Sequence, residues 1–342
     1  GTKAPLLLRF PVEKLVKTLQ NHKLVDWGIW APKDSDQQDY KTADWAVNEL
    51  SQKPKDPFFM AVGFFRPHVP LFVPPKWFEL YDEKKIALPK NPKTDLDDLP
   101  KNFLAINDYA VAPTHAQVVE SGKQRSLTHA YLASVSFVDH CVGIVLDALK
   151  ASSHADNTII VLWSDHGWHL GEKQRWRKFT LWEEATRVPF IISAPGTGRA
   201  GQRCAQPVSL VDIFPTLIEL CNLPPIRNLD GISLVPWLQD PAKSRQTPAL
   251  TIEESGHVSL RTLHHRVIRY TTGEWELYDH RTDPSERTNL AKDSRHQEVI
   301  KSASRWLPQS PSAPAATKKS FTFDPHNFTW KRKKTGEIIK GK

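Results

Sequence analysis

Short, continuous apolar runs separated by longer amphipathic stretches constrain this chain most. The clearest runs cover residues 58–64 and 158–163, and a shorter one covers 188–192. Apolar runs of this length are typical of strands covered on both faces. Strands that alternate with helices form a parallel or mostly parallel sheet flanked by helices. The sequence therefore predicts an α/β fold.

Two long helices are expected beside this sheet. In residues 39–53, apolar residues recur at three- and four-residue intervals and give one apolar face: Tyr40, Ala43, Val47 and Leu50. The same spacing runs through residues 126–152 in a longer set: Leu127, Ala130, Tyr131, Val135, Val138, Val142, Val145 and Leu149. A third, shorter helix is expected within 208–223, where Pro215 fits best in a first helical turn.

The sequence pattern changes beyond Pro241, from long amphipathic stretches to short strand-like runs. Four short strand-like runs follow at close spacing: 249–254, 258–262, 266–271 and 275–278. Such spacing predicts a small antiparallel sheet. We therefore divide the chain into an α/β core over 1–240, an antiparallel subdomain over 241–308, and a basic, loosely ordered tail over 309–342. The polar, proline-punctuated residues 89–113 predict a long surface excursion.

Composition excludes several classes of protein. Apolar residues make up 39% and charged residues 25% of the 342 residues, so the chain can bury a core and is neither disordered, collagenous nor a coiled coil. The excess of 46 basic over 38 acidic residues, +8, is scattered. Three widely spaced cysteines indicate neither a disulfide framework nor a C-x-x-C metal site. We expect no membrane span, and the compartment stays open.

Chemically active residues follow two of the predicted strands. Asp165 and His166 come directly after residues 158–163, and Arg66 and His68 come after residues 58–64. Ligands of open α/β sheets bind at the carboxyl ends of the strands. An adjacent carboxylate and imidazole can share a cation if Gly167 lets the backbone bend. On spacing alone, a helix-capping Asp165 beside a packed His166 is an equal alternative.

A basic and aromatic segment follows over residues 168–179. Five of its residues can carry positive charge: His169, Lys173, Arg175, Arg177 and Lys178. Such a segment suits a bound oxyanion, whereas each cation taken alone is more typical of a solvated face. Base stacking on the interleaved aromatics is conceivable, but no nucleic-acid-binding fold is visible, so we expect no nucleic-acid partner.

Residues 164–172 read S-D-H-G-W-H-L-G-E, with Trp176 and Lys178 downstream. This block resembles the second signature of the formylglycine-dependent sulfatases, in particular their iduronate 2-sulfatase-like branch, within the alkaline phosphatase superfamily. The resemblance continues in residues 64–70, 230–236, 276–279, 283–284 and 289–291. It covers roughly residues 25–305.

The resemblance implies a fold and a set of roles. The fold would be an alkaline-phosphatase-like α/β core, incomplete at its N-terminus, with the small antiparallel subdomain. Asp165 and His166 would bind a divalent metal, usually calcium in these enzymes, which prefers hard oxygen ligands. Lys178 would contact the sulfate oxygens, where preorganised charge stabilises a transition state. His68 would lie near the departing ester oxygen, as a proton donor.

Two family elements are absent from this sequence. Sulfatases of this kind attack sulfur with a formylglycine made from the cysteine of a C-x-P-S-R motif, and an Asp-Asp pair on the first strand completes the metal site. None of Cys141, Cys204 and Cys221 begins that motif. The chain therefore resembles the C-terminal two-thirds of a sulfatase, and a missing N-terminal segment of the same protein would be its partner. We expect the chain alone not to hydrolyse an aryl sulfate.

Three functions follow as hypotheses. The first is a metal-dependent sulfuric ester hydrolase that acts on a sulfated sugar or another sulfated small molecule. The second is a phosphodiester or phosphonate ester hydrolase of the same superfamily, because a phosphoryl centre needs similar charge stabilisation. The third is a degenerate, non-catalytic sulfatase that binds an anionic glycan. An upstream C-x-P-S-R in the coding sequence would favour the enzymes.

Overall fold

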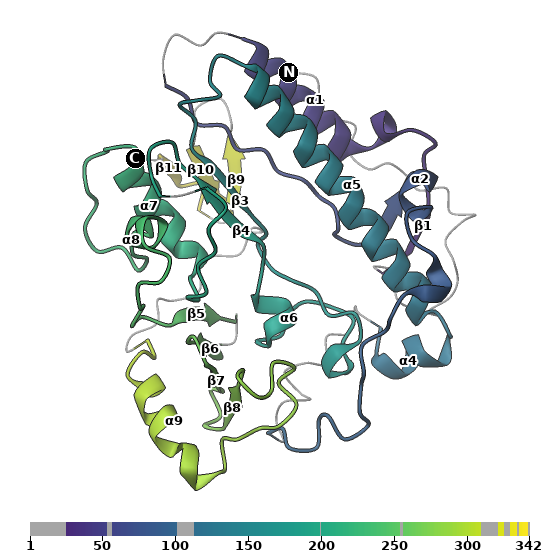
Figure 1. Cartoon of the computed structure of the whole chain (residues 1–342), viewed down its shortest axis with the longest axis vertical. Helices are drawn as coiled ribbons and strands as arrows, with labels where there is room; N and C mark the ends of the chain where they lie inside the picture. Colours follow the sequence, from purple (N-terminus) through teal and green to yellow (C-terminus); the bar gives the residue numbers. More distant parts are fainter. Residues whose placement is uncertain are drawn as a thin grey trace.

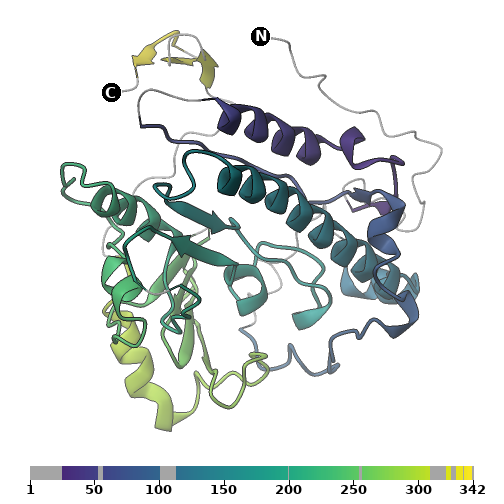
Figure 2. The ribbon, with the colours of Figure 1, turned by 45° about the horizontal axis from the view of Figure 1, so that its top comes forward.

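A computed structural model describes residues 25–52, 57–100, 113–198, 200–253, 256–308, 321–324, 329–333 and 335–340. Its two long helices, α1 (Gln38–Ser51) and α5 (Gln124–Ala151), lie side by side along one edge of the molecule (Figures 1 and 2). Both agree with the helices predicted over 39–53 and 126–152. The amphipathic spacing was enough to predict them because it is a local property of the sequence.

Small residues of α1 bring the two helices together. Ala43 of α1 is completely buried in one cluster with Ala133, Phe137 and Cys141 of α5. Burial of a side chain as large as Phe137 contributes about 1.5–3 kcal/mol. By length and composition alone α5 could cross a membrane, but buried core helices pass the same test, so our expectation of no membrane span stays a prediction. In the structure α5 packs against α1, α2 (Pro75–Phe78) and β2 (Leu71–Val73).

The core strands are shorter and less parallel than the sequence predicts. β1 (Trp27–Ile29) pairs in parallel with β2, and β3 (Ile160–Trp163) pairs antiparallel with β4 (Phe190–Ser193). The antiparallel pairing arises because residues 164–189 return the chain to the same edge. β2 forms although this part of the chain is rich in proline, because its three residues lie between Pro70 and Pro74.

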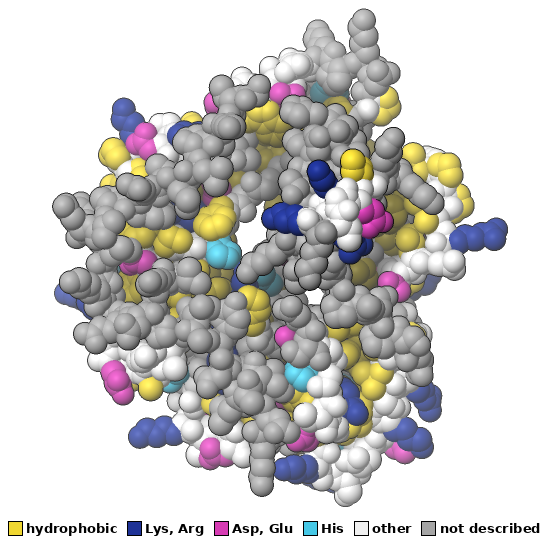
Figure 3. Space-filling view, turned by 180° about the vertical axis from the view of Figure 1, so that it is seen from behind, with side chains coloured by type: hydrophobic (Ala, Val, Ile, Leu, Met, Phe, Trp, Pro, Cys, Tyr) yellow, Lys and Arg dark blue, Asp and Glu magenta, His cyan; other side chains and the backbone are white. Residues whose placement is uncertain are grey.

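The apolar run 58–64 is not the covered strand that we predicted. It has no ladder partner among the described residues, and Phe59 is 82% exposed. Trp163 of β3 and Ile191 of β4 are about half exposed as well. Hydrophobic side chains border a hollow near the middle of the face shown in Figure 3. Side chains of an apolar run are buried only where neighbouring strands or helices cover them, and the run itself does not determine those neighbours.

The C-terminal half contains the predicted antiparallel sheet, in the order β5 (Ala249–Ile252), β6 (Val258–Arg261), β7 (His265–Arg269) and β8 (Trp275–Asp279). One face packs under α9 (Gln297–Ser304) through a cluster that includes Leu260, Leu277 and Ile300. The other face packs against the core, because Tyr278 and Ile268 contact Leu181 and Trp182. This second contact brings the sheet close to the residues discussed below.

The remaining elements are short. The other α-helices are α4 (His115–Glu120), α6 (Glu183–Thr186), α7 (Ile213–Leu220) and α8 (Val235–Gln239). The 3-10 turns are η2 (Asp34–Asp36), η3 (Glu83–Lys85), η4 (Glu172–Gln174), η5 (Leu210–Asp212) and η6 (Ser294–His296). Pro215 lies in the first turn of α7, as expected.

The tail that we expected to be loosely ordered contains three antiparallel strands in its described residues. They are β9 (Phe321–Asp324), β10 (Thr329–Arg332) and β11 (Ile338–Lys340). Of the predicted excursion over 89–113, residues 89–100 contain turns without helix or strand, and residues 101–112 lie outside the described residues. The domain boundaries near residues 240 and 308 stay predictions.

Candidate active site

Three nitrogen-bearing side chains from separate parts of the chain converge. The Lys178 ammonium lies 2.9 Å from Nε2 of His166 and 3.3 Å from Nε2 of His68. His166 follows β3, and His68 follows the run 58–64. The structure therefore brings together three of the four site residues proposed from the sequence, and the fourth, Asp165, is the direct neighbour of His166.

Both imidazoles are held in one tautomer. The Nδ1 of His166 lies 2.8 Å from the Gly167 carbonyl oxygen, and the Nδ1 of His68 lies 2.7 Å from the Val69 carbonyl oxygen. A carbonyl oxygen can only accept, so each Nδ1 carries the proton and each neutral ring has its lone pair on Nε2. Both lone pairs face Lys178, and no carboxylate of the described residues forms an ion pair with this ammonium. The ammonium can bind an anion, and either imidazole could donate to the same anion once its Nε2 is protonated.

Asp165 is positioned to share a cation with His166. Its Oδ2 lies 3.5 Å from His166 Nε2, and its Oδ1 accepts the His166 backbone N–H at 3.0 Å. The side chain is 81% exposed and caps no helix, so the helix-cap alternative is not realised. Calcium takes six to eight oxygen ligands. Asp165 offers oxygen atoms to such a shell, whereas His166 could join it only if its Nε2 lone pair left Lys178 for the cation, because a neutral imidazole has one ring lone pair.

A buried carboxylate on α1 positions the loop that carries His68. Both oxygens of Asp39 accept backbone N–H groups, from Phe65 and Arg66, at 2.8 Å each. The Arg66 guanidinium donates to the carbonyl oxygens of Phe72 and His68, which closes the loop. Sequence reasoning missed Asp39, because only a long-range contact distinguishes it from an ordinary acidic residue in a first helical turn.

Gly167 is required for a reason that differs from our expectation. We expected it to allow a bend, but a Cβ at this position would lie 1.9 Å from the carbonyl oxygen of Glu184 in α6. The Gly167 N–H donates to the carbonyl oxygen of Ala185 at 2.8 Å. Close approach of α6 therefore fixes the residue that follows His166.

Of the five cationic candidates in 168–179, only Lys178 contacts the two histidines. Lys173 is buried and pairs with Asp95, with 3.2 Å between Nζ and Oδ1. His169 is completely buried, and burial lowers its pKa to about 3, so its ring is neutral at physiological pH. Arg177 is buried too. The alternative of a solvated face is therefore wrong for His169, Lys173 and Arg177, because all three are buried.

A second cluster has the composition of a metal site. Ligand atoms of Glu183, His280 and Glu286 all lie within 4.8 Å of one another. The Arg266 guanidinium already donates to both carboxylates. Burial opposes ionisation of Glu286, but the Arg266 charge and the His280 hydrogen bond outweigh it and lower its pKa to about 2. The cluster is an ion-pair network, in which the guanidinium takes the place of a cation.

Comparison with known proteins decides the family. A sequence model of the family described as Sulfatase matches residues 13–223, and a second, described as N-sulphoglucosamine sulphohydrolase, C-terminal, matches residues 171–311. The chain belongs to the sulfatase family. The resemblance carried by residues 164–172 is thereby confirmed.

Relatives of this sulfatase chain are longer than the chain itself. A protein named sulfatase from Formosa agariphila is 38% identical over 301 residues, which cover 88% of this chain and 59% of that protein. Iduronate 2-sulfatase of Mus musculus is 34% identical over 203 residues, which cover 49% of this chain and 36% of the mouse protein. The chain thus spans little more than half of the Formosa relative, and the resemblance to the iduronate 2-sulfatase-like branch is confirmed.

Solved structures confirm the alkaline-phosphatase-like fold. The phosphonate monoester hydrolase of Agrobacterium radiobacter superposes with a TM-score of 0.69 at 22% identity and covers 91% of this chain and 66% of its own. A structure of BT4656 in complex with its substrate D-glucosamine-2-N,6-O-disulfate has a TM-score of 0.62 at 23% identity and covers 79% and 68%. At these identities the likeness concerns the fold alone.

Proposed function

We propose that this chain carries part of the active site of a metal-dependent sulfuric ester hydrolase that acts on a sulfated sugar. The observation that carries the proposal is the convergence of Lys178, His68 and His166, because a tetrahedral sulfate needs cationic and hydrogen-bonding groups on several of its oxygens. Membership of the sulfatase family supports the reaction class.

Each site residue receives a role in this proposal. The Lys178 ammonium binds the non-bridging sulfate oxygens. His68, once protonated at Nε2, gives that proton to the oxygen of the departing alcohol, while its Nδ1–H stays bonded to Val69. Asp165 and His166 would hold the divalent metal, calcium by family resemblance, and His166 Nε2 would then face the metal in place of Lys178. The bound metal would neutralise charge on the sulfate.

A sulfated sugar is proposed as the substrate class on the names of similar proteins. The mouse relative is an iduronate 2-sulfatase, and the BT4656 structure contains a disulfated glucosamine. Both proteins act on or bind a sulfate ester that is attached to a sugar. A sugar sulfate also fits a site whose acid, His68, lies in a half-buried loop near the molecular surface.

Sulfate binding tests the site in the chain as it stands. Equilibrium dialysis of residues 1–342 against radiolabelled sulfate should show one site, and Lys178→Ala should weaken it at least about tenfold, because a charge-assisted hydrogen bond contributes about 1.5–3 kcal/mol. Lys150→Ala is the matched control, since Lys150 is exposed in the last turn of α5. Equal affinities for the chain and its Lys178→Ala variant would contradict the proposal.

Hydrolysis assays with aryl esters distinguish a sulfatase from a phosphonate hydrolase. We expect residues 1–342 alone to leave a fluorogenic aryl sulfate intact, because no C-x-P-S-R nucleophile is present. Turnover that disappears on Asp165→Ala would refute this expectation. With the full gene product, a higher rate on an aryl sulfate than on an aryl phosphonate supports a sulfatase, and the reverse order supports the phosphonate hydrolase.

A further inference from the structure

We propose that Glu286 is a positioning residue, which holds Lys178 at hydrogen-bond distance from His166 by anchoring the segment 181–183 to the C-terminal sheet. This inference rests on the proposed function for the role of Lys178. It assigns a function to residues 276–289, which have no role in the catalytic proposal.

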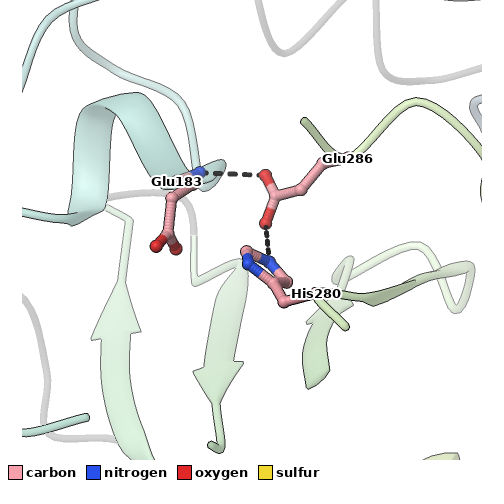
Figure 4. Close-up of side chains that lie close together, drawn as sticks. All are labelled: Glu183, His280 and Glu286. Carbon is pink, nitrogen blue, oxygen red and sulfur yellow. Dashed lines mark hydrogen bonds and ion pairs between the residues drawn. The ribbon is translucent and has the colours of Figure 1, made fainter. Parts of the chain in front are cut away.

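Glu286 is completely enclosed by donors. Its Oε2 accepts the backbone N–H of Glu183, at the start of α6, at 2.9 Å, and its Oε1 accepts from His280 Nε2 at 2.8 Å (Figure 4). The same Oε1 accepts the Nε–H of Arg266. Only 1% of the residue is exposed. A carboxylate this deeply buried and this well satisfied fixes the backbone to which it is bonded.

Each residue of the segment 181–183 is anchored separately. Arg266 of β7 donates through Nη1 to the carbonyl oxygen of Leu181 at 3.1 Å. The indole N–H of Trp182 donates to the buried carboxylate of Glu276 on β8 at 2.8 Å. Glu286 binds Glu183 as described. Three ionisable side chains, two from β7 and β8 and one from the turn after β8, therefore hold three consecutive residues of the core.

The segment 181–183 is connected to both Lys178 and His166, whose side chains lie 2.9 Å apart. Lys178 lies three residues before Leu181. Following the chain the other way, α6 accepts the Gly167 N–H through Ala185, and Gly167 is the neighbour of His166. Loosening the segment 181–183 would therefore release Lys178 and His166 from each other.

Backbone strain next to Lys178 makes the anchor necessary. Phe179 has a φ of 62°, in the left-handed region that bulky residues avoid. Such a conformation persists only where the surrounding structure holds it. The next residue is held as well, because Thr180 Oγ1 lies 2.7 Å from Nε2 of the buried His169. Without the anchor at 181–183, Phe179 would relax and turn the Lys178 side chain away.

A double-mutant cycle distinguishes positioning from general destabilisation. Glu286→Gln should weaken sulfate binding about tenfold in the otherwise unchanged chain, measured by dialysis at a temperature where near-UV circular dichroism shows a native fold. In the Lys178→Ala background the same change should alter the affinity by less than about twofold, because its effect passes through Lys178. Glu298→Gln, at an exposed site of α9, is the control and should change neither. Unchanged affinity in Glu286→Gln, or equal losses in both backgrounds, overturns the inference.

A second readout does not depend on sulfate binding. The ¹⁵N resonance of His166 Nε2 reports its hydrogen bond to Lys178, so in Glu286→Gln it should move toward its position in Lys178→Ala. A resonance that stays in place overturns the inference, whereas failure of the unchanged chain to bind sulfate overturns the proposed function alone. Glu286→Asp keeps the buried charge but shortens the reach to the Glu183 N–H, so it should fold and still move this resonance. If Glu286→Gln does not fold, an unmoved resonance in Glu286→Asp refutes the positioning role.

Discussion

Replacement of Gly167 by alanine tests how closely α6 and the residue after His166 are packed. The added Cβ would lie 1.9 Å from the carbonyl oxygen of Glu184 and 3.1 Å from that of Arg187. Both neighbours are backbone atoms, so no flexible side chain can move away. Separation to an ordinary contact would require a shift of more than about 1 Å and would break the bond from Gly167 to Ala185. We expect a loss of about 3 kcal/mol, at the upper end for overpacking.

The assay compares two glycine variants of the same chain. Urea unfolding at pH 7 gives the free energy of unfolding for Gly167→Ala and for Gly143→Ala. Gly143 lies within α5, where nothing is within 4 Å of the added Cβ, so alanine should stabilise the chain by about 0.5–1 kcal/mol. Sulfate binding should fall only in Gly167→Ala, because His166 is displaced. A Gly167→Ala variant as stable as the unchanged chain, with sulfate affinity intact, refutes the reasoning.

Three further predictions concern the carboxyl groups of Asp39 and Glu286, which are buried, and of Glu184, which is half-buried. Asp39→Asn loses one of two acceptors for the N–H groups of Phe65 and Arg66, so it should cost about 1–3 kcal/mol in urea unfolding and weaken sulfate binding through His68; no change in either measurement contradicts this. Burial raises the pKa of Glu184 to about 7, so its folded-state penalty grows as pH rises from 4.5 to 7. Glu184→Gln should therefore raise the melting temperature at pH 8 and leave it unchanged at pH 4, and the opposite order would be inconsistent. The pKa of Glu286 is lowered from 4.5 to about 2, so its contribution, on the order of 3 kcal/mol, is complete above pH 4.5 and is lost between pH 4.5 and 2. In Glu286→Gln this part of the acid unfolding curve should flatten, and an unchanged acid limb counts against the ion pair.

The helices and the C-terminal sheet could be predicted because their signals are local. The repeat that contains Ala43 and Leu50 predicted α1 within a few residues, and the close strand-like runs predicted β5 to β8. The run 58–64 has an equally strong apolar signal but forms no ladder in the described residues. Its state depends on which strands lie beside it, and periodicity carries no information about neighbours.

The candidate site was predictable in part, for a related reason. Residue types and strand ends indicated His68, Asp165 and His166. Lys178 depended on family resemblance, because four other candidate cations precede it in the same segment. Asp39 and Glu286 carried no signal at all. Their importance lies in backbone groups 26 and 103 positions away, which only the folded chain brings to them.

Crystals of the chain soaked with tungstate, a heavy analogue of sulfate, would test the central claim most directly through the anomalous signal of tungsten. The account predicts one strong site whose oxygens lie about 3 Å from the ammonium of Lys178 and, in crystals kept acidic enough to protonate the ring, from Nε2 of His68. Anomalous density elsewhere on the molecule, with none beside these two side chains, would contradict it.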